Sequence, residues 1–223
     1  MYITRTPIST LAYSTKEIYG LRSYYSKDEL KQVYEFEELY SNTLKINPIF
    51  DLVITEDSNA GNSFFKLLYK DFKVLSGNGN ASVVKVLQET TETNVLCIVD
   101  GADYGAHIYK IYSYAQHNKS RNITIWLPES FEFILLKAGV ISFTGLDKIL
   151  ENPSEYVECK DYLSWERFFT ALAQQYGNNY RKGKLPKYYK NDIFIEKVKN
   201  IMPKELLLDS TNNVKDITKM NLF

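Results

Sequence analysis

Acidic residues directly follow two apolar segments of this sequence, where their carboxylates could act together. Glu56 follows the apolar run at 52–54, and Asp100 and Asp103 follow the run at 95–99. Carboxylates that lie close together repel one another unless a divalent cation or a shared proton neutralises them. Mg²⁺ (or Mn²⁺) suits such a site, because a hard cation takes one or two carboxylates together with waters and a substrate phosphate. We therefore predict that Glu56, Asp100 and Asp103 are metal ligands and catalytic residues.

Each of these acids also has a simpler explanation in local structure. Glu56 and Asp57 could cap a following helix, since acids favour the positive end of a helix. The pair Asp100-Gly101 could be a tight turn with a capping aspartate. The metal site is the stronger interpretation at the second position, because Asp103 continues the acidic pattern there.

A glycine-rich turn follows a third apolar run. Gly77 and Gly79 stand in the sequence Ser-Gly-Asn-Gly-Asn at 76–80. Glycines would let a phosphate backbone approach the chain closely, which makes both residues candidates for nucleic-acid binding. The turn lacks the Lys-Ser/Thr ending of a P-loop, and an ordinary turn is the alternative.

A basic segment with interleaved tyrosines occupies residues 180–190 and contains no acid. Cations bind phosphates, and tyrosine rings stack on unpaired bases. A solvated basic loop is the alternative interpretation. The candidate nucleic-acid contacts in this segment are Arg181, Lys182, Lys184, Lys187 and Tyr188.

Two more acids, Glu129 and Glu132, follow a fourth apolar run at 123–127. If that run is a strand beside the others, Glu129 could support the metal site or bind a second metal. A glutamate facing solvent in the first turn of a helix is the alternative.

The elements that would position these residues alternate along the chain between strand and helix patterns. Apolar runs of strand type alternate with helical patterns, which predicts a parallel four-stranded sheet with helices on both faces. Ligands bind at the carboxyl ends of the strands in such α/β sheets. The expected strands are 52–54, 72–75, 95–99 and 123–127, and the expected helices are 61–69, 83–87, 106–116 and 131–136.

Two further regions flank this α/β core, which we place at 49–142. Residues 1–25 show no clear period, and Ser26-Lys27-Asp28-Glu29 has the spacing of a capping box, which predicts a helix reaching Leu39. We therefore expect a helical N-terminal extension over 1–48. Residues 143–223 are predicted to be mostly helical, with helices starting near 164 and 193.

The order of strand, acid and helix resembles the Toprim domain, the catalytic core that topoisomerases, bacterial primases and OLD-type nucleases share. Glu56 after the first strand, Asp100 after the third and Gly105 at the start of a helix match the pattern of that family. The resemblance covers about residues 50–140 and implies a magnesium-dependent site that acts on nucleic-acid phosphodiesters. The chain departs from the family's Asp-x-Asp element, because its acids are spaced Asp100-x-x-Asp103.

Composition limits the class of protein further. Lys and Arg number 27 and Asp and Glu number 27, which argues against a polybasic protein that grips phosphate over its whole surface. Cys97 lies in an apolar run, and we expect it and Cys159 to be free thiols in a reducing compartment. No apolar run is long enough to span a bilayer or to form a signal peptide, so we expect a cytoplasmic protein without a membrane partner.

Two functions from different classes follow from these patterns. The first is magnesium-dependent phosphodiester hydrolysis on DNA or RNA. We prefer hydrolysis to a topoisomerase reaction, because no tyrosine among the 18 stands out as the nucleophile that a topoisomerase needs. The alternative is a non-catalytic interaction or regulatory protein of a phage or mobile element that keeps the Toprim-like scaffold and binds a protein partner. A weaker third possibility is a nucleotide-binding regulator that uses the glycine turn.

Overall fold

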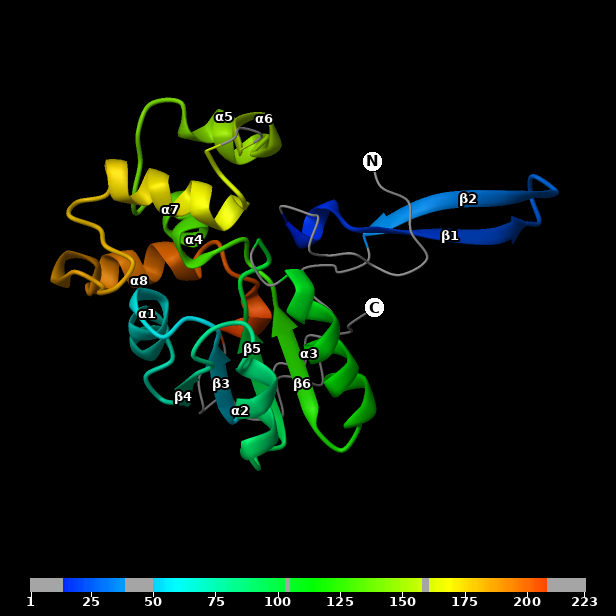
Figure 1. Ribbon diagram of the computed structural model, residues 1–223, viewed down its shortest axis with the longest axis horizontal. Helices are drawn as coiled ribbons and strands as arrows, with labels where there is room; N and C mark the ends of the chain where they lie inside the picture. Colours follow the sequence, from blue (N-terminus) through cyan, green and yellow to red (C-terminus); the bar gives the residue numbers. More distant parts are fainter. Residues whose placement is uncertain (1–13, 39–49, 103–104, 158–160, 208–223) are drawn as a thin grey trace.

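A four-stranded parallel sheet lies at the centre of the computed structural model, which describes residues 14–38, 50–102, 105–157 and 161–207 (Figure 1). Its strand order is β4-β3-β5-β6, so the first of these strands along the chain lies inside the sheet. The predicted parallel α/β arrangement is confirmed. The strands are β3 (Leu52–Thr55), β4 (Lys73–Ser76), β5 (Asn94–Ile98) and β6 (Asn122–Trp126).

Helices cover both faces of this sheet. Val53 and Leu96 belong to a core shared with α1 and α4, whereas Ile54 and Cys97 belong to a separate core with α2 and α3. Neighbouring residues of a strand point to opposite faces, so both faces of these strands are apolar. The helices that follow the four strands are α1 (Ala60–Leu68), α2 (Val83–Glu89), α3 (Gly105–His117) and α4 (Phe131–Lys137).

The C-terminal region is mostly helical, as predicted, and packs on the α1 and α4 side. The rings of Phe133 in α4 and Phe169 in α7 lie 4.9 Å apart, and both belong to the core that contains α1. Its elements are α5 (Leu146–Glu151), α6 (Ser154–Val157), α7 (Trp165–Tyr176) and α8 (Asp192–Lys199), with short 3₁₀ turns η3 (Lys187–Tyr189) and η4 (Lys204–Leu206).

Short polar side chains start three of these helices. The hydroxyl of Ser130 accepts a hydrogen bond from the amide of Phe133 at the start of α4, and Ser164 does the same for Arg167 in α7. The side chain of Asn191 caps α8 in the same way. Each cap satisfies a backbone donor that has no partner within its helix.

The predicted N-terminal helix is wrong, because residues 19–38 form an antiparallel β-hairpin. Its strands are β1 (Tyr19–Ser26) and β2 (Lys31–Glu38), and they follow a 3₁₀ turn, η2 (Thr15–Glu17). The amide of Glu29 does donate to the hydroxyl of Ser26, as a capping box requires. The chain then reverses through Leu30, whose φ is 52°, instead of continuing as a helix. Residues 1–13 and 39–48 of the proposed extension lie outside the described ranges.

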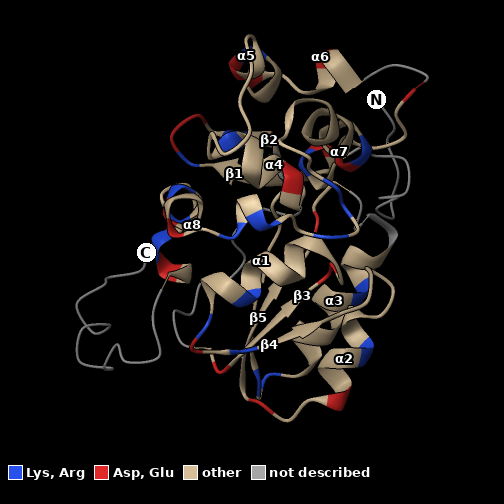
Figure 2. Ribbon diagram, turned by 90° about the vertical axis from the view of Figure 1, so that its left-hand side faces the viewer, with Lys and Arg blue, Asp and Glu red and all other residues tan. Residues whose placement is uncertain are grey.

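Charge is mixed over the surface. Segments with Lys and Arg alternate with segments that contain Asp and Glu in the view of Figure 2, as expected for equal numbers of the two kinds.

Cys97 is fully buried, and burial raises the pKa of its thiol to about 12. Cys159 lies outside the described residues. Within the described ranges, no helix is long and apolar enough to cross a membrane.

The close approach of the β4 end to α2 gives a stability prediction. A Cβ at Gly77 would lie 2.6 Å from Cγ2 of Val83 and 3.2 Å from the Thr55 carbonyl oxygen. We expect Gly77→Ala to lower the free energy of unfolding by about 1–3 kcal/mol, as overpacking does elsewhere. Urea unfolding followed by circular dichroism measures the change. Gly183→Ala is the control, because a Cβ there meets no atom within 4 Å. Equal stability of the two variants would contradict the packing argument.

Candidate functional site

The chain leaves the carboxyl ends of the neighbouring strands β3 and β5 towards opposite faces of the sheet. The register pairs Thr55 with Ile98, and the amide of Glu56 donates to the Ile98 carbonyl at 2.8 Å, which extends the pairing beyond β3. The helix after β3 covers one face, and the helix after β5 covers the other. A crevice forms outside the sheet at such a switch point, and ligands bind there in open α/β sheets. Glu56 and Asp100 therefore stand at the position where a ligand is expected.

Like charges surround Asp100 at this point. Burial is the main reason that the pKa of Asp100 lies well above its usual range, and the neighbouring carboxylates of Glu56, Glu132 and Asp57 raise it further. The ammonium group of Lys182 opposes the shift. The structure thus brings Glu56 and Asp100 close enough to interact electrostatically. Asp57, the residue after Glu56, and Glu132 in α4 lie near Asp100 as well.

Asp57 has a structural task within this group. Its Oδ1 accepts a hydrogen bond from the amide of Asn59 at 2.8 Å, and its Oδ2 accepts one from Gly61 at 2.7 Å. Any residue with a Cβ at position 61 would place that atom 2.8 Å from Oδ2 of Asp57, so glycine is the residue that fits this close contact. Asp57 therefore caps the start of α1, as the capping interpretation of Glu56 and Asp57 predicted for this residue.

The glycine-rich turn after β4 is tied to the loop after β3. The amide of Gly77 donates to the Thr55 carbonyl at 2.7 Å, and the amide of Gly79 donates to the Glu56 carbonyl at 2.9 Å. The hydroxyl of Ser76 donates to the carbonyl of Asp57 at 3.1 Å. Because both glycine amides bond within the protein, they add no donors to a phosphate cradle; they hold the two loops together beside Glu56.

Glu129 is neutralised by the segment before the hairpin. It is 1% exposed, its Oε2 accepts from the hydroxyl of Ser14 at 2.6 Å, and Lys16 lies 2.9 Å from its Oε1. The amide of Ala102 donates to the Glu129 carbonyl, so the loops after β5 and β6 are joined as well. Glu129 is thus neither a glutamate facing solvent nor free to bind a metal, and it anchors residues 14–16 to the sheet end.

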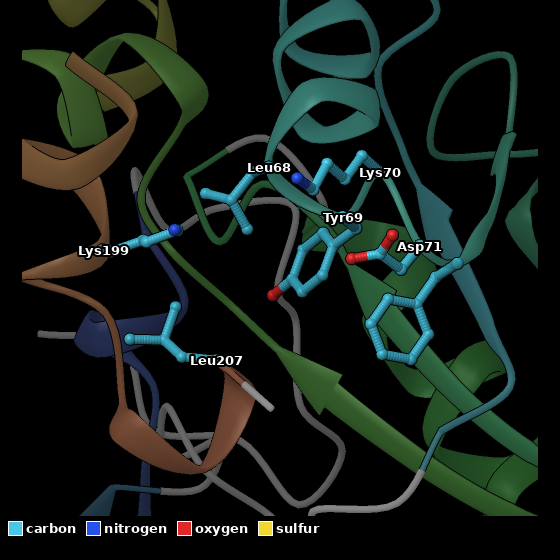
Figure 3. Close-up of a pocket in the computed structure, with 7 residues that line it drawn as sticks. Leu68, Tyr69, Lys70, Asp71, Lys199 and Leu207 are labelled. Carbon is cyan, nitrogen blue, oxygen red and sulfur yellow. The ribbon is translucent and has the colours of Figure 1, made fainter. Parts of the chain in front are cut away.

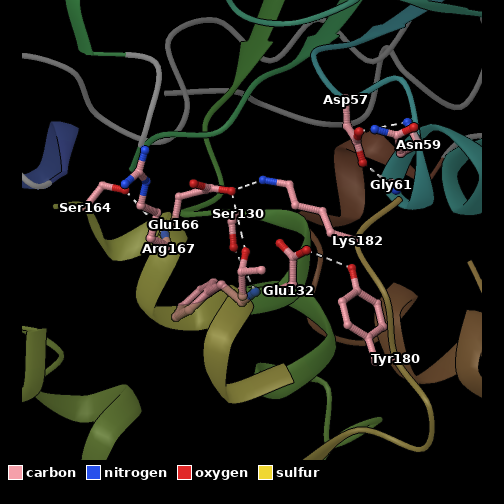
Figure 4. Close-up of polar contacts among 12 residues, drawn as sticks. Asp57, Asn59, Gly61, Ser130, Glu132, Ser164, Glu166, Arg167, Tyr180 and Lys182 are labelled. Atoms are coloured by element: carbon pink, nitrogen blue, oxygen red, sulfur yellow. Dashed lines mark hydrogen bonds and ion pairs between the residues drawn. The ribbon is translucent and has the colours of Figure 1, made fainter. Parts of the chain in front are cut away.

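Two buried acids that the sequence did not place at the site face the same region (Figure 4). Glu132 in α4 is 2% exposed and accepts a hydrogen bond of 2.7 Å from the hydroxyl of Tyr180. Glu166 in α7 forms an ion pair with Lys182. Burial and the Glu132 carboxylate raise the pKa of Tyr180, so its hydroxyl stays protonated and donates. No local pattern predicts these pairs, because their members stand far apart in the sequence.

The basic segment divides into buried and exposed residues. Tyr180 and Tyr189 are buried, so Tyr188 alone of the three tyrosines between 180 and 190 offers an exposed ring. The carbonyl of Lys182 accepts from the amide of Ala60, which places the segment at the start of α1, beside Asp57. The exposed cations of the segment are Arg181, Lys184, Lys187 and Lys190.

Asp103, the third predicted ligand, lies outside the described residues. Among the residues that the structure does describe, no group of three or more His, Cys, Asp or Glu side chains is arranged to hold a metal ion. Any cation that binds between Glu56 and Asp100 would therefore need ligands from water or substrate, which is the usual situation for Mg²⁺.

A surface pocket lies elsewhere, at the opposite end of α1 (Figure 3). The hydroxyl of Tyr69 at its wall donates to the Leu206 carbonyl at 3.0 Å, and burial raises the pKa of this tyrosine. Since α1 begins beside Asp57 and the pocket lies beyond its last turn, the pocket is separate from the acidic cluster. Its lining consists of Leu68, Tyr69, Lys70, Asp71, Phe72, Lys199 and Leu207.

The raised pKa of Asp100 predicts how stability depends on pH. The folded protein holds the Asp100 proton more tightly than the unfolded chain, so stability is full below the ordinary aspartate pKa and falls as pH rises through the raised value. We expect Asp100→Asn to raise the melting temperature by a few degrees at pH 7–8 and to leave it unchanged near pH 3. Differential scanning calorimetry across this range measures the effect. Asp71→Asn, at an exposed position, is the control; a lower melting temperature for Asp100→Asn at pH 7 would contradict the repulsion.

Comparison with known proteins adds no relative to this picture. No family model matches the chain, no curated protein matches it, and no solved structure matches it. The comparisons therefore do not identify a Toprim domain, and the resemblance rests on the acids and their order along the strands.

Proposed function

We propose that this protein hydrolyses phosphodiester bonds of nucleic acid with the help of Mg²⁺ or Mn²⁺. The observation that carries the proposal is the meeting of Glu56 and Asp100 at the switch point of a parallel sheet, with further carboxylates around Asp100. A Toprim-like domain, with metal ligands on these two strand ends, is the form of site that we infer.

The chemistry of the donors fits a hard divalent cation. Carboxylate oxygens are the ligands that Mg²⁺ prefers, and the mutual repulsion around Asp100 is of the kind that a bound cation relieves. Glu56 and Asp100 would hold the ion, and Asp103 would join them if its side chain reaches the site. When bound, such an ion activates water and neutralises charge on a scissile phosphate.

The chain's own residues would divide the remaining tasks. Glu56 serves as a ligand or as the general base that takes a proton from the attacking water. Lys182, held beside the acids by Glu166, supplies a positive charge for a phosphate oxygen. Arg181, Lys184 and the ring of Tyr188 lie exposed on the same segment, where they would bind the strand.

A nuclease assay tests the proposal. Labelled single-stranded and double-stranded DNA and RNA are incubated with the full chain and Mg²⁺ or Mn²⁺. We expect cleavage that EDTA abolishes and that Asp100→Asn and Glu56→Gln each lower by about 100-fold or more, since both remove a charge from the reacting centre. Glu89→Gln, an exposed α2 position, should cleave at the wild-type rate.

Metal binding is read separately from cleavage. We expect Mg²⁺ in the millimolar range to raise the melting temperature of the wild-type chain and to have a much smaller effect on Asp100→Asn. Absence of cleavage on all four substrates, together with equal metal responses in wild type and Asp100→Asn, would refute the proposed activity.

The basic segment makes a prediction that does not depend on catalysis. Arg181→Glu combined with Lys184→Glu should weaken the binding of single-stranded nucleic acid by about 10-fold or more at low salt and flatten the dependence of binding on salt. Fluorescence anisotropy with a labelled oligonucleotide measures both. Lys85→Glu together with Lys110→Glu, on α2 and α3, is the matched control, because it makes the same change in net charge on other exposed helices. Equal losses in the two double variants would show that only net charge matters.

A non-catalytic interaction protein is the second candidate. It is favoured by the internal neutralisation of the acids near the site, since Asp57 caps a helix and Glu129 is paired with Lys16. In that case the Asp100→Asn chain would keep its biological partner, and the nuclease assay would be negative.

A further inference from the structure

The β1–β2 hairpin is a two-faced ribbon. Residues that pair across the two strands share a face, and successive residues of one strand alternate between faces. One face carries Arg22, Tyr24, Lys31 and Glu35, and the hydroxyl of Tyr24 donates to Glu35 at 2.9 Å. The other face, which we call the apolar ribbon face, consists of Tyr19, Leu21, Ser23, Tyr25, Gln32, Tyr34 and Phe36, with Glu38 at its end, paired with Tyr19.

The apolar ribbon face is uncovered by the described part of the chain. Its five large side chains are between 54% and 66% exposed, and Figure 1 shows the hairpin extending away from the helices and the sheet. A two-stranded hairpin is marginally stable in water on its own, and contiguous exposed apolar patches mark interaction sites. The five side chains are Tyr19, Leu21, Tyr25, Tyr34 and Phe36.

We propose that this face is a dimer interface, and that its occupant is the same face of a second copy of this chain. The part of this face from Leu21 to Tyr25 and from Gln32 to Phe36 carries no charge, because its one charged residue, Glu38, pairs with Tyr19 at the end of the face. Two copies can therefore meet over the uncharged part without repulsion. Flat apolar faces of two ribbons stack in the way that two sheets do, and one two-fold axis relates them.

The area available is sufficient for a dimer. An aromatic or large aliphatic side chain covers roughly 150–250 Å² when fully buried, so five side chains with more than half of their surface exposed offer roughly 450–750 Å² per copy. Two copies together bury roughly 900–1,500 Å², which reaches the lower end of specific protein interfaces. We therefore expect a dimer that dissociates in the micromolar range.

The charge of the hairpin argues against nucleic acid as the occupant. Residues 19–38 contain three cationic and five acidic residues, and no cation lies on the apolar ribbon face. Binding to nucleic acid depends on neutralising phosphates, for which this face has no group. The same net negative charge opposes binding to an anionic membrane surface.

Sedimentation equilibrium of the full chain tests the dimer. Wild-type protein should change from 25.9 kDa towards twice that mass between about 1 and 100 µM. Tyr34→Glu and Leu21→Glu place a charge in the interface and should each raise the dissociation constant by about 10-fold or more.

Val33→Glu is the matched control, since it adds the same charge at the next residue of β2, on the face that carries Arg22 and Lys31. It should dimerise as the wild type does. Far-ultraviolet circular dichroism and melting curves confirm that all three variants fold. A wild-type chain that remains at 25.9 kDa at about 100 µM overturns the proposal. A dimer that persists in both Tyr34→Glu and Leu21→Glu also overturns it, as does a monomeric wild type that binds neutral phosphatidylcholine vesicles.

Discussion

The burial of both faces of the parallel sheet is the constraint on which the rest of this structure depends. All four residues of β3 and four of the five in β5 are buried. Strands of this kind leave no solvated face, so polar side chains that act together must stand beyond the strand ends. With the strand order β4-β3-β5-β6, the chain leaves β3 and β5 towards opposite faces of the sheet. A crevice therefore forms at the carboxyl ends of these two strands, where Glu56 and Asp100 stand.

Most of the acids at this end of the sheet have a positively charged or hydrogen-bonding partner of their own. Backbone amides of α1 stabilise Asp57, Lys16 pairs with Glu129, and Lys182 pairs with Glu166. Asp100 differs from these acids, because burial and neighbouring carboxylates together favour its protonated form. A cation in this crevice would relieve a cost that the folded chain otherwise bears, whereas Lys182 relieves only part of it. The electrostatics thus distinguish the acids that stabilise the fold from Asp100, the acid at which a bound cation would relieve the most repulsion.

The sequence predicts the local parts of this arrangement well and its long-range pairs poorly. Apolar runs at 52–54 and 95–99 locate two strands, and the acids after them follow because strand ends are the exposed points of a buried sheet. The bonds between Tyr180 and Glu132 and between Lys182 and Glu166 are different. They depend on how α4 and α7 pack, which no local pattern encodes. Lys182 looks like one more cation of a basic loop until α7 brings Glu166 beside it.

The hairpin shows why a local pattern can mislead. The bond from the Glu29 amide to the Ser26 hydroxyl occurs at a helix start and also in this turn, so Ser-x-x-Glu does not distinguish them. Pairing across two strands decides between them, because it collects Leu21, Tyr34 and Phe36 on one face. The central sheet covers its apolar faces with helices, and the same physical requirement applies to the hairpin. No described helix or strand meets it there, so the covering surface must come from beyond the described residues, and a matching apolar ribbon meets that requirement with no change of fold.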